Sequence, residues 1–115
     1  MACYLAAMLL PTITDEALDE LRGANARAAE VFRVRTSYGD VVLRTPFRAE
    51  FKRFQAEILD EKKRADAGER LVRACVLAPD LPTFDSALDA RPGLATTLLG
   101  PLVDKSGASG AFSLD

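Results

Sequence analysis

Residues 31–59 read VFRVRTSYGDVVLRTPFRAEFKRFQAEIL, and this stretch decides the predicted fold. Two short runs rich in β-branched residues, 31–36 and 41–45, flank a turn segment that contains Gly39. Glycine can adopt the positive φ of a tight turn, so the pattern predicts a β-hairpin. A helix should follow, because Thr45 can cap it and Pro46 suits its first position.

The register of the hairpin predicts two different faces. A turn at Tyr38-Gly39 places Val34 opposite Leu43 and Arg33 opposite Arg44. One face is then apolar, with Phe32, Val34, Val41 and Leu43. The other face holds Val42 and three arginines, Arg33, Arg35 and Arg44. Two interpretations stay open for these arginines: a solvated surface, or a face that meets an acidic segment in this chain or in a partner.

The predicted central helix runs to about Arg64 and carries an aromatic stripe. Its apolar residues recur at spacings of four, three and four, which places them on one side of a helix: Phe47, Phe51, Phe54 and Ile58, widened by Leu59. We expect this stripe to pack on the apolar face of the hairpin. The alternative leaves one or two of the phenylalanines exposed as a groove for a partner.

The flanking segments predict further helices. Before the hairpin, a short acidic helix ends near Gly23, and its acids are the expected partners of the arginines: Asp15, Glu16, Asp19 and Glu20. After the central helix, a second helix starts at Asp66 and buries Leu71, Val72, Cys75 and Val76. Thr83 should cap a third helix, Arg91-Pro92-Gly93 should end it, and residues 94–102 should form the last.

Together these patterns predict an α+β fold, with a short N-terminal helix, one β-hairpin, and three to four helices packed on it. We divide the chain into an apolar start and acidic helix (1–30), a hairpin-plus-helix domain (31–105) and a flexible tail (106–115). The start, MACYLAAMLL, is too short to span a bilayer and lacks a basic leader region. It either docks as an extra apolar turn or precedes a natural start at Met8, and in the second case residues 1–7 are dispensable.

Charge is distributed unevenly along the 115 residues, whose net charge is −2. Residues 31–64 carry nine basic and five acidic side chains, whereas the segments before and after each have three more acids than bases. A basic middle between acidic flanks can be neutralised internally or by self-association. The acidic total and the few aromatic residues among the basic ones argue against nucleic-acid binding.

Catalytic and metal-binding patterns are missing from the sequence. There is no histidine, and the two cysteines, Cys3 and Cys75, are too far apart in sequence to suggest a zinc site or a disulfide framework. No glycine-rich phosphate loop or nucleophile-elbow serine occurs. We therefore expect no enzymatic activity and no cofactor, and we expect Cys75 to behave as a small buried hydrophobic residue.

A family resemblance rests on three motifs. Residues 42–46 (VLRTP) and 48–54 (RAEFKRF), then 71–76 (LVRACV) with Pro79-Asp80, and finally Arg91-Pro92-Gly93-Leu94 resemble small proteins from the tail gene cluster of long-tailed bacteriophages. These proteins are similar to tail assembly chaperones. The resemblance covers residues 31–107 and leaves MACYLAAMLL outside it.

The resemblance implies a non-enzymatic protein of the bacterial host cytoplasm. Tail assembly chaperones bind the long, aggregation-prone tape-measure protein before the tail tube forms around it, and they often occur also in an extended, frameshifted form. The expected partner is therefore a tape-measure or other tail protein, with no membrane contact. The alternative is a structural or adaptor protein of the tail or the head–tail connection. We expect partner binding by Arg33, Arg35, Arg44, Arg48 and Lys52, and by Phe51 and Phe54 if they are exposed.

Overall fold

A computed structural model describes residues 9–107 as five helices and one antiparallel sheet of three strands. In chain order the elements are α2 (Asp15–Ala24), β1 (Val31–Thr36), β2 (Gly39–Arg44), α3 (Arg48–Ile58), α4 (Arg64–Cys75), β3 (Val76–Ala78), α5 (Leu81–Ala90) and α6 (Gly93–Lys105). The sheet order is β1-β2-β3. The predicted α+β class, with a helix before the hairpin and helices after it, is confirmed.

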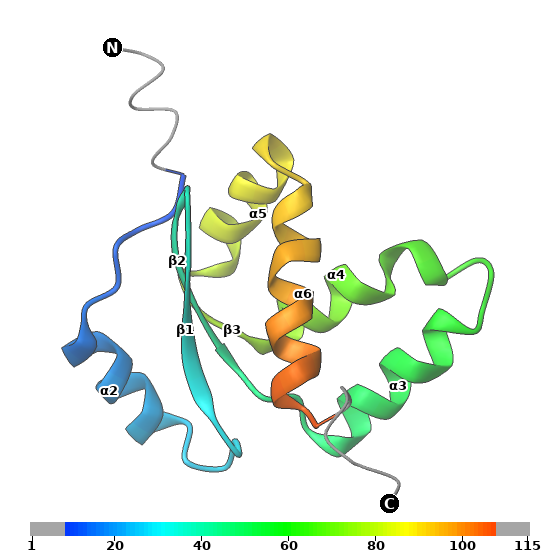
Figure 1. The fold of residues 1–115 in the computed structure, drawn as a ribbon, viewed down its shortest axis with the longest axis horizontal. Coiled ribbons are helices and arrows are strands. Elements are labelled where there is room, and N and C mark those ends of the chain that lie inside the picture. The colour runs from blue at the N-terminus through cyan, green and yellow to red at the C-terminus, as the bar shows by residue number, and fades with distance from the viewer. Residues whose placement is uncertain (1–8, 108–115) are drawn as a thin grey trace, which may run out of the picture.

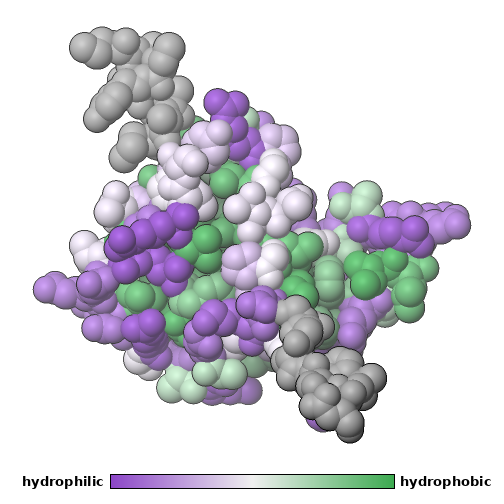
Figure 2. Space-filling view, viewed as in Figure 1, coloured by the Kyte–Doolittle hydropathy of each residue, from purple (hydrophilic) through white to green (hydrophobic). Residues whose placement is uncertain are grey.

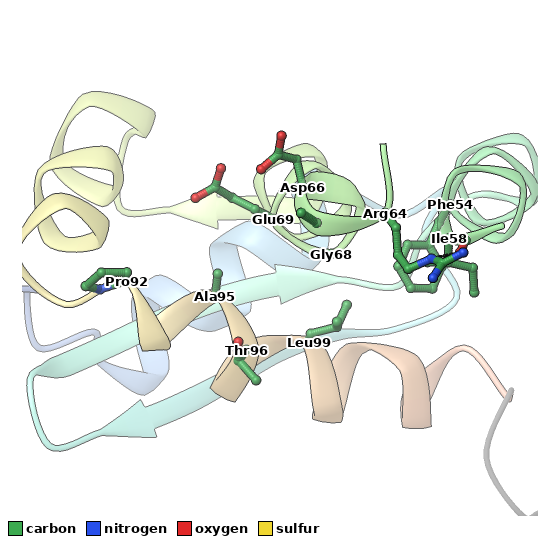
Figure 3. A pocket seen from close by; sticks show the side chains of 11 residues that line it. Phe54, Ile58, Arg64, Asp66, Gly68, Glu69, Pro92, Ala95, Thr96 and Leu99 are labelled. Carbon is green, nitrogen blue, oxygen red and sulfur yellow. Dashed lines mark hydrogen bonds between the residues drawn. The ribbon is translucent and has the colours of Figure 1, made fainter. Parts of the chain in front are cut away.

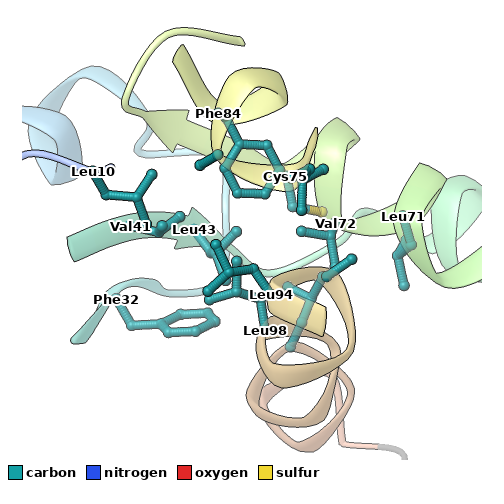
Figure 4. Packing of buried hydrophobic residues seen from close by; sticks show 14 of the residues in the cluster. Leu10, Phe32, Val41, Leu43, Leu71, Val72, Cys75, Phe84, Leu94 and Leu98 are labelled. Carbon is teal, nitrogen blue, oxygen red and sulfur yellow. The ribbon is translucent and has the colours of Figure 1, made fainter. Parts of the chain in front are cut away.

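The helices are arranged unequally about the sheet (Figure 1). Helix α2 lies on one face, while α4, α5 and α6 lie on the other, and α3 with the start of α4 projects away from the sheet as a helical hairpin. The main core therefore forms between the sheet and the later helices. Its fully buried side chains include Val41 and Leu43 of β2, Val72 and Cys75 of α4, Phe84 of α5, and Leu98 and Leu102 of α6 (Figure 4).

A second, smaller core lies under α2. Ile13 and Leu18 pack there against Val31 and Val42 of the hairpin. Val42 therefore has no solvent contact, although it shares a sheet face with the arginines. The sheet is thus covered on both faces, which is why β2 is buried along four consecutive residues.

The turn of the hairpin differs from the prediction. It is Ser37-Tyr38, so Val34 pairs with Val41 and Arg33 with Val42, and the predicted opposition of Arg33 and Arg44 does not occur. The predicted register is wrong by two residues, and a shift of two keeps every side chain on its face. The apolar and arginine-bearing faces are therefore as predicted.

Gly39 explains why the turn lies where it does. Its φ is +125°, which side-chain-bearing residues rarely adopt, and a Cβ there would lie 2.3 Å from the carbonyl oxygen of Leu10. Leu10 donates its N–H to Tyr38 O at 2.9 Å, and Asp40 N–H reaches Pro11 O at 2.8 Å. The segment before α2 therefore runs along the hairpin beside Gly39, and Leu10 is buried there at 2 % exposure.

Helix starts are the second group of corrections. Thr45 does not cap α3: it is buried, and its hydroxyl accepts the N–H of Glu30. The capping group is the carboxylate of Glu50, which accepts the Phe47 N–H at 2.9 Å. Asp80, rather than Thr83, caps α5, since its carboxylate accepts both the N–H and the hydroxyl of Thr83.

The predicted central helix is shorter than expected. It ends at Ile58, and α4 begins at Arg64 instead of Asp66, because Asp60 O accepts the N–H groups of Lys63 and Arg64 and forms the connecting turn. Leu71, Val72 and Cys75 are buried as predicted. Val76 instead begins β3, a strand absent from the sequence prediction. The predictions for residues 1–7 and for most of the tail concern residues outside the described range.

Candidate interaction surfaces

The aromatic stripe of α3 is divided between core and solvent. Phe54 is buried at 9 % exposure, and Phe51 is half-buried against the main core with its ring centroid 5.7 Å from that of Phe54. Phe47 and Ile58 are each 38 % exposed and Leu59 is 80 % exposed. The prediction that the whole stripe packs on the hairpin is wrong, because α3 packs mainly against α4 in the projecting helical hairpin.

A groove opens where this helical hairpin meets α6. We call it the three-helix groove; its volume is about 310 Å³. Its apolar lining comes from Phe54 and Ile58 of α3 and from Ala95 and Leu99 of α6, and its polar lining includes Arg64, Asp66, Glu69 and Thr96 (Figure 3). Figure 2 shows the corresponding surface, where hydrophobic side chains gather on the α3–α4 projection and on the body beside it.

Gly68 and Leu99 meet in the lining of the three-helix groove. A Cβ at position 68 would lie 2.7 Å from Leu99 Cδ2, so the tip of the Leu99 side chain occupies the space that a side chain at position 68 would need. Leu99 of α6 lies across the groove from Gly68 of α4 and lines it (Figure 3). The three-helix groove can bind a row of apolar side chains from another molecule, and charged groups of α4 lie at the rim of the groove.

The arginines of the sheet lie in three different surroundings. Arg33 has a side chain 15 % exposed, donates to Ile13 O at 2.8 Å and pairs with Asp15 at 2.8 Å. The prediction that the acidic helix meets the arginine face is therefore confirmed for this pair. Arg35 is exposed, and no described residue forms an ion pair with it.

Arg44 is held inside an ion-pair network that joins β2, α3 and α4. Its guanidinium donates to both carboxylate oxygens of Glu50, at 2.7 and 2.9 Å, and to Ala74 O at 3.0 Å. It also stacks 4.3 Å above the ring of Phe47, and its side chain is 12 % exposed. The hydrogen bonds from Arg44 lower the pKa of Glu50, and the same bonds raise the pKa of Arg44. This network is structural, and it removes Arg44 from the solvent-facing surface.

Cys75 lies next to this network, and its thiol has low reactivity. Its side chain is fully buried, and burial raises the pKa of its thiol to about 11, against a smaller lowering influence of Arg44. A thiol with such a pKa is protonated at neutral pH and a poor nucleophile. The predicted role of a small buried hydrophobic residue therefore agrees with its environment.

The predicted partner-binding residues do not form one surface. Arg48 and Lys52 are exposed on α3, Arg35 is exposed on β1, and the remaining four are at least partly withdrawn: Arg33, Arg44, Phe51 and Phe54. Sequence reasoning placed Ile58 and Leu59 on the packed apolar stripe and Leu99 on the apolar face of the last helix. Their exposure depends on where α3 ends and on how α6 crosses α4, neither of which the apolar spacing encodes.

Two kinds of site are missing from residues 9–107. No group of three or more His, Cys, Asp or Glu side chains in this range is placed to hold a metal ion. Across the same range, no helix combines the length and the apolar character that crossing a membrane requires.

Comparison with known proteins gives a fold relationship. No protein-family model and no curated protein matches the chain. A solved structure, that of the uncharacterised protein rbstp2171 from Bacillus stearothermophilus, is similar with a TM-score of 0.64 and 24 % sequence identity. The match covers 84 % of this chain and 98 % of that one, so nearly the whole of that protein shares this fold.

Proposed function

We propose that this protein is a non-enzymatic tail assembly chaperone of a long-tailed bacteriophage, acting in the bacterial host cytoplasm. In this proposal it binds an amphipathic helical segment of the tape-measure protein and keeps it soluble until the tail tube forms. The observation that carries the proposal is the three-helix groove, with Ile58 and Leu59 exposed beside it. The motif resemblance of residues 31–107 to tail-cluster proteins supplies the identity of the client.

The dimensions of the groove suit a helix. Pro92, the N-cap of α6, and Leu99 of α6 are seven positions apart, which corresponds to about 10 Å along a helix axis. Apolar anchors at positions i, i+3, i+4 and i+7 of a client helix span the same length. An amphipathic helix can therefore place its apolar side on Leu99 and Ile58.

The polar rim favours a client with charged flanks. Arg64 lies at one wall of the groove, with Asp66 and Glu69 two and five residues further along α4. Arg48 and Lys52 add exposed positive charge to α3 outside the groove. In this proposal Arg48 and Lys52 speed association with acidic parts of the client, because exposed charges affect association rates more than affinity.

Co-expression with the tape-measure protein encoded beside this gene tests the proposal. The yield of soluble tape-measure protein and its recovery with this protein should both rise when the two are expressed together. The double variant Ile58→Glu/Leu59→Glu should reduce recovery about tenfold, as loss of a binding anchor does. Leu81→Glu is the matched control, since Leu81 is 41 % exposed and lies outside the groove.

Two outcomes would contradict the proposal. If the tape-measure protein is equally soluble without its partner and no complex forms, the chaperone function is wrong. If the protein is retained in finished phage particles, it is instead a structural or adaptor component of the tail. Equal loss of recovery for Leu81→Glu and for the double variant would remove the groove from the binding site.

A further inference from the structure

The outer edge of β1 is an open sheet edge in the described part of the chain. Thr45 donates its N–H to Glu30 O, so residues 30 and 45 form a hydrogen-bonded pair of the antiparallel ladder. Such pairs alternate, so in the observed register the N–H and C=O groups of residues 31, 33 and 35 point away from β2. This geometry agrees with Arg22, whose Nε reaches Val31 O from outside at 3.2 Å.

Two residues of this edge remain available. Within residues 9–107, no group outside the hairpin hydrogen-bonds to the backbone of Arg33 or Arg35. The edge therefore offers two N–H donors and two C=O acceptors in strand geometry. An unpaired row of this kind is a template for an added strand.

We propose that β1 binds an extended acidic segment of a partner protein, which adds to the sheet as a fourth strand opposite Arg33 and Arg35. The side chains decide what that segment contains. Arg35 is exposed and has no ion-pair partner among the described residues, so its guanidinium is available to an acid on an added strand. Arg33 pairs with Asp15 and its side chain is 15 % exposed, so an acid opposite it would share this guanidinium with Asp15.

Val34, which lies between the two arginines, determines which side chains must alternate along the partner strand. Val34 points to the opposite face of the sheet, where it is half-buried against the main core. A strand paired with β1 would place an apolar side chain beside Val34 and acids beside the two arginines. The recognised pattern is therefore acidic, apolar, acidic.

A second copy of this chain fits the edge poorly. Antiparallel pairing of two β1 strands centred on Val34 sets Arg33 against Arg35 twice, and pairing centred on Arg33 sets that arginine against its own copy. Like charges directly opposed across a strand pair are destabilising. The occupant with complementary charge is thus a different, acidic chain, and this surface is separate from the three-helix groove.

Amide exchange of the full-length protein tests the inference. The probe is a blocked peptide of alternating glutamate and valine, and the control peptide carries lysine in place of glutamate. At nine-tenths saturation, the outward N–H groups of Arg33 and Arg35 should exchange about tenfold more slowly, because exchange then occurs only from the free state. The N–H of Val34 already bonds within the hairpin and should not change, which makes it an internal control.

Substitutions separate backbone pairing from charge. Arg35→Gln keeps the N–H and should weaken binding about threefold, as loss of an exposed charge pair does. Arg35→Pro also removes the outward N–H, a change that an edge strand tolerates, and should weaken binding more than about tenfold. Lys62→Gln removes the same charge from the exposed turn between α3 and α4 and should leave binding unchanged.

Four results would overturn the inference. The first is equal binding of the lysine peptide and the glutamate peptide. The second is slower amide exchange at the three-helix groove instead of at β1. The third is no slowing of amide exchange at about 2 mM peptide, a concentration at which even weak binding is detected. The fourth is protection of Arg33 and Arg35 that grows with protein concentration alone, which would identify a second copy as the occupant. If Arg35→Pro does not fold, Arg35→Gln and the exchange pattern still decide the question.

Discussion

Replacing Glu50 with glutamine tests the ion-pair network that joins the sheet to the helical hairpin. The change removes the negative charge from two hydrogen bonds to Arg44, of 2.7 and 2.9 Å, in a pair whose side chains are 12 % and 20 % exposed. Breaking a fully buried pair costs about 3–5 kcal/mol. Here Ala74 O and the Phe47 ring still contact Arg44, and the glutamine oxygen can still cap Phe47 N–H. We therefore expect a loss of about 2 kcal/mol.

The pH dependence of this loss has a definite sign. Glu50 has a folded-state pKa below its ordinary value of 4.5, mainly because of the hydrogen bonds from Arg44. Its stabilising contribution is therefore complete above pH 4.5 and disappears as the pH falls through the lowered folded-state pKa. The difference in unfolding free energy between the wild type and Glu50→Gln should shrink below pH 4.5.

Urea unfolding followed by circular dichroism, at pH 7 and in a series of acidic buffers, measures both effects. Asp19→Asn is the matched control, because the Asp19–Arg22 pair has side chains 73 % and 52 % exposed and should contribute less than about 0.5 kcal/mol. A double-mutant cycle with Arg44→Met isolates the pair itself. If Glu50→Gln unfolds within about 0.5 kcal/mol of the wild type at pH 7, or if the difference is the same at every pH, the assigned role of the network is wrong.

Three further predictions concern the core, the turn and helix α2. Phe54→Ala should destabilise the protein by about 3–5 kcal/mol, as buried aromatic truncations do, and Phe51→Ala by roughly half as much because its side chain is only half-buried; equal losses in thermal unfolding would contradict the division of the stripe. Gly39→Ala should cost at least about 2 kcal/mol, because of the positive φ and the contact with Leu10. Gly23→Ala, where a Cβ meets nothing within 4 Å, should instead stabilise α2 by about 0.5 kcal/mol, and a loss there would show that the glycine is required.

The sequence by itself determined the fold class, the helix–hairpin–helix order and the two faces of the hairpin. These follow from local periodicity: side chains alternate along a strand, and apolar residues recur every three or four positions along a helix. The face assignment was correct even though the register was not, because a shift of two residues does not exchange faces. The sequence also predicted that acids of the first helix pair with the arginine face, and the ion pair between Arg33 and Asp15 confirms this prediction.

Tertiary structure alone decided which part of each apolar stripe reaches the core. The spacing of Phe54 and Ile58 is that of one helix face, yet one side chain is buried and the other is 38 % exposed, because α3 extends beyond the body that could cover it. The local pattern of α3 assigns no partner to Glu50, and the β2–α3 connection brings it to Arg44. β3 and the groove at Leu99 depend on contacts between segments distant in sequence, and local patterns carry no information about such contacts.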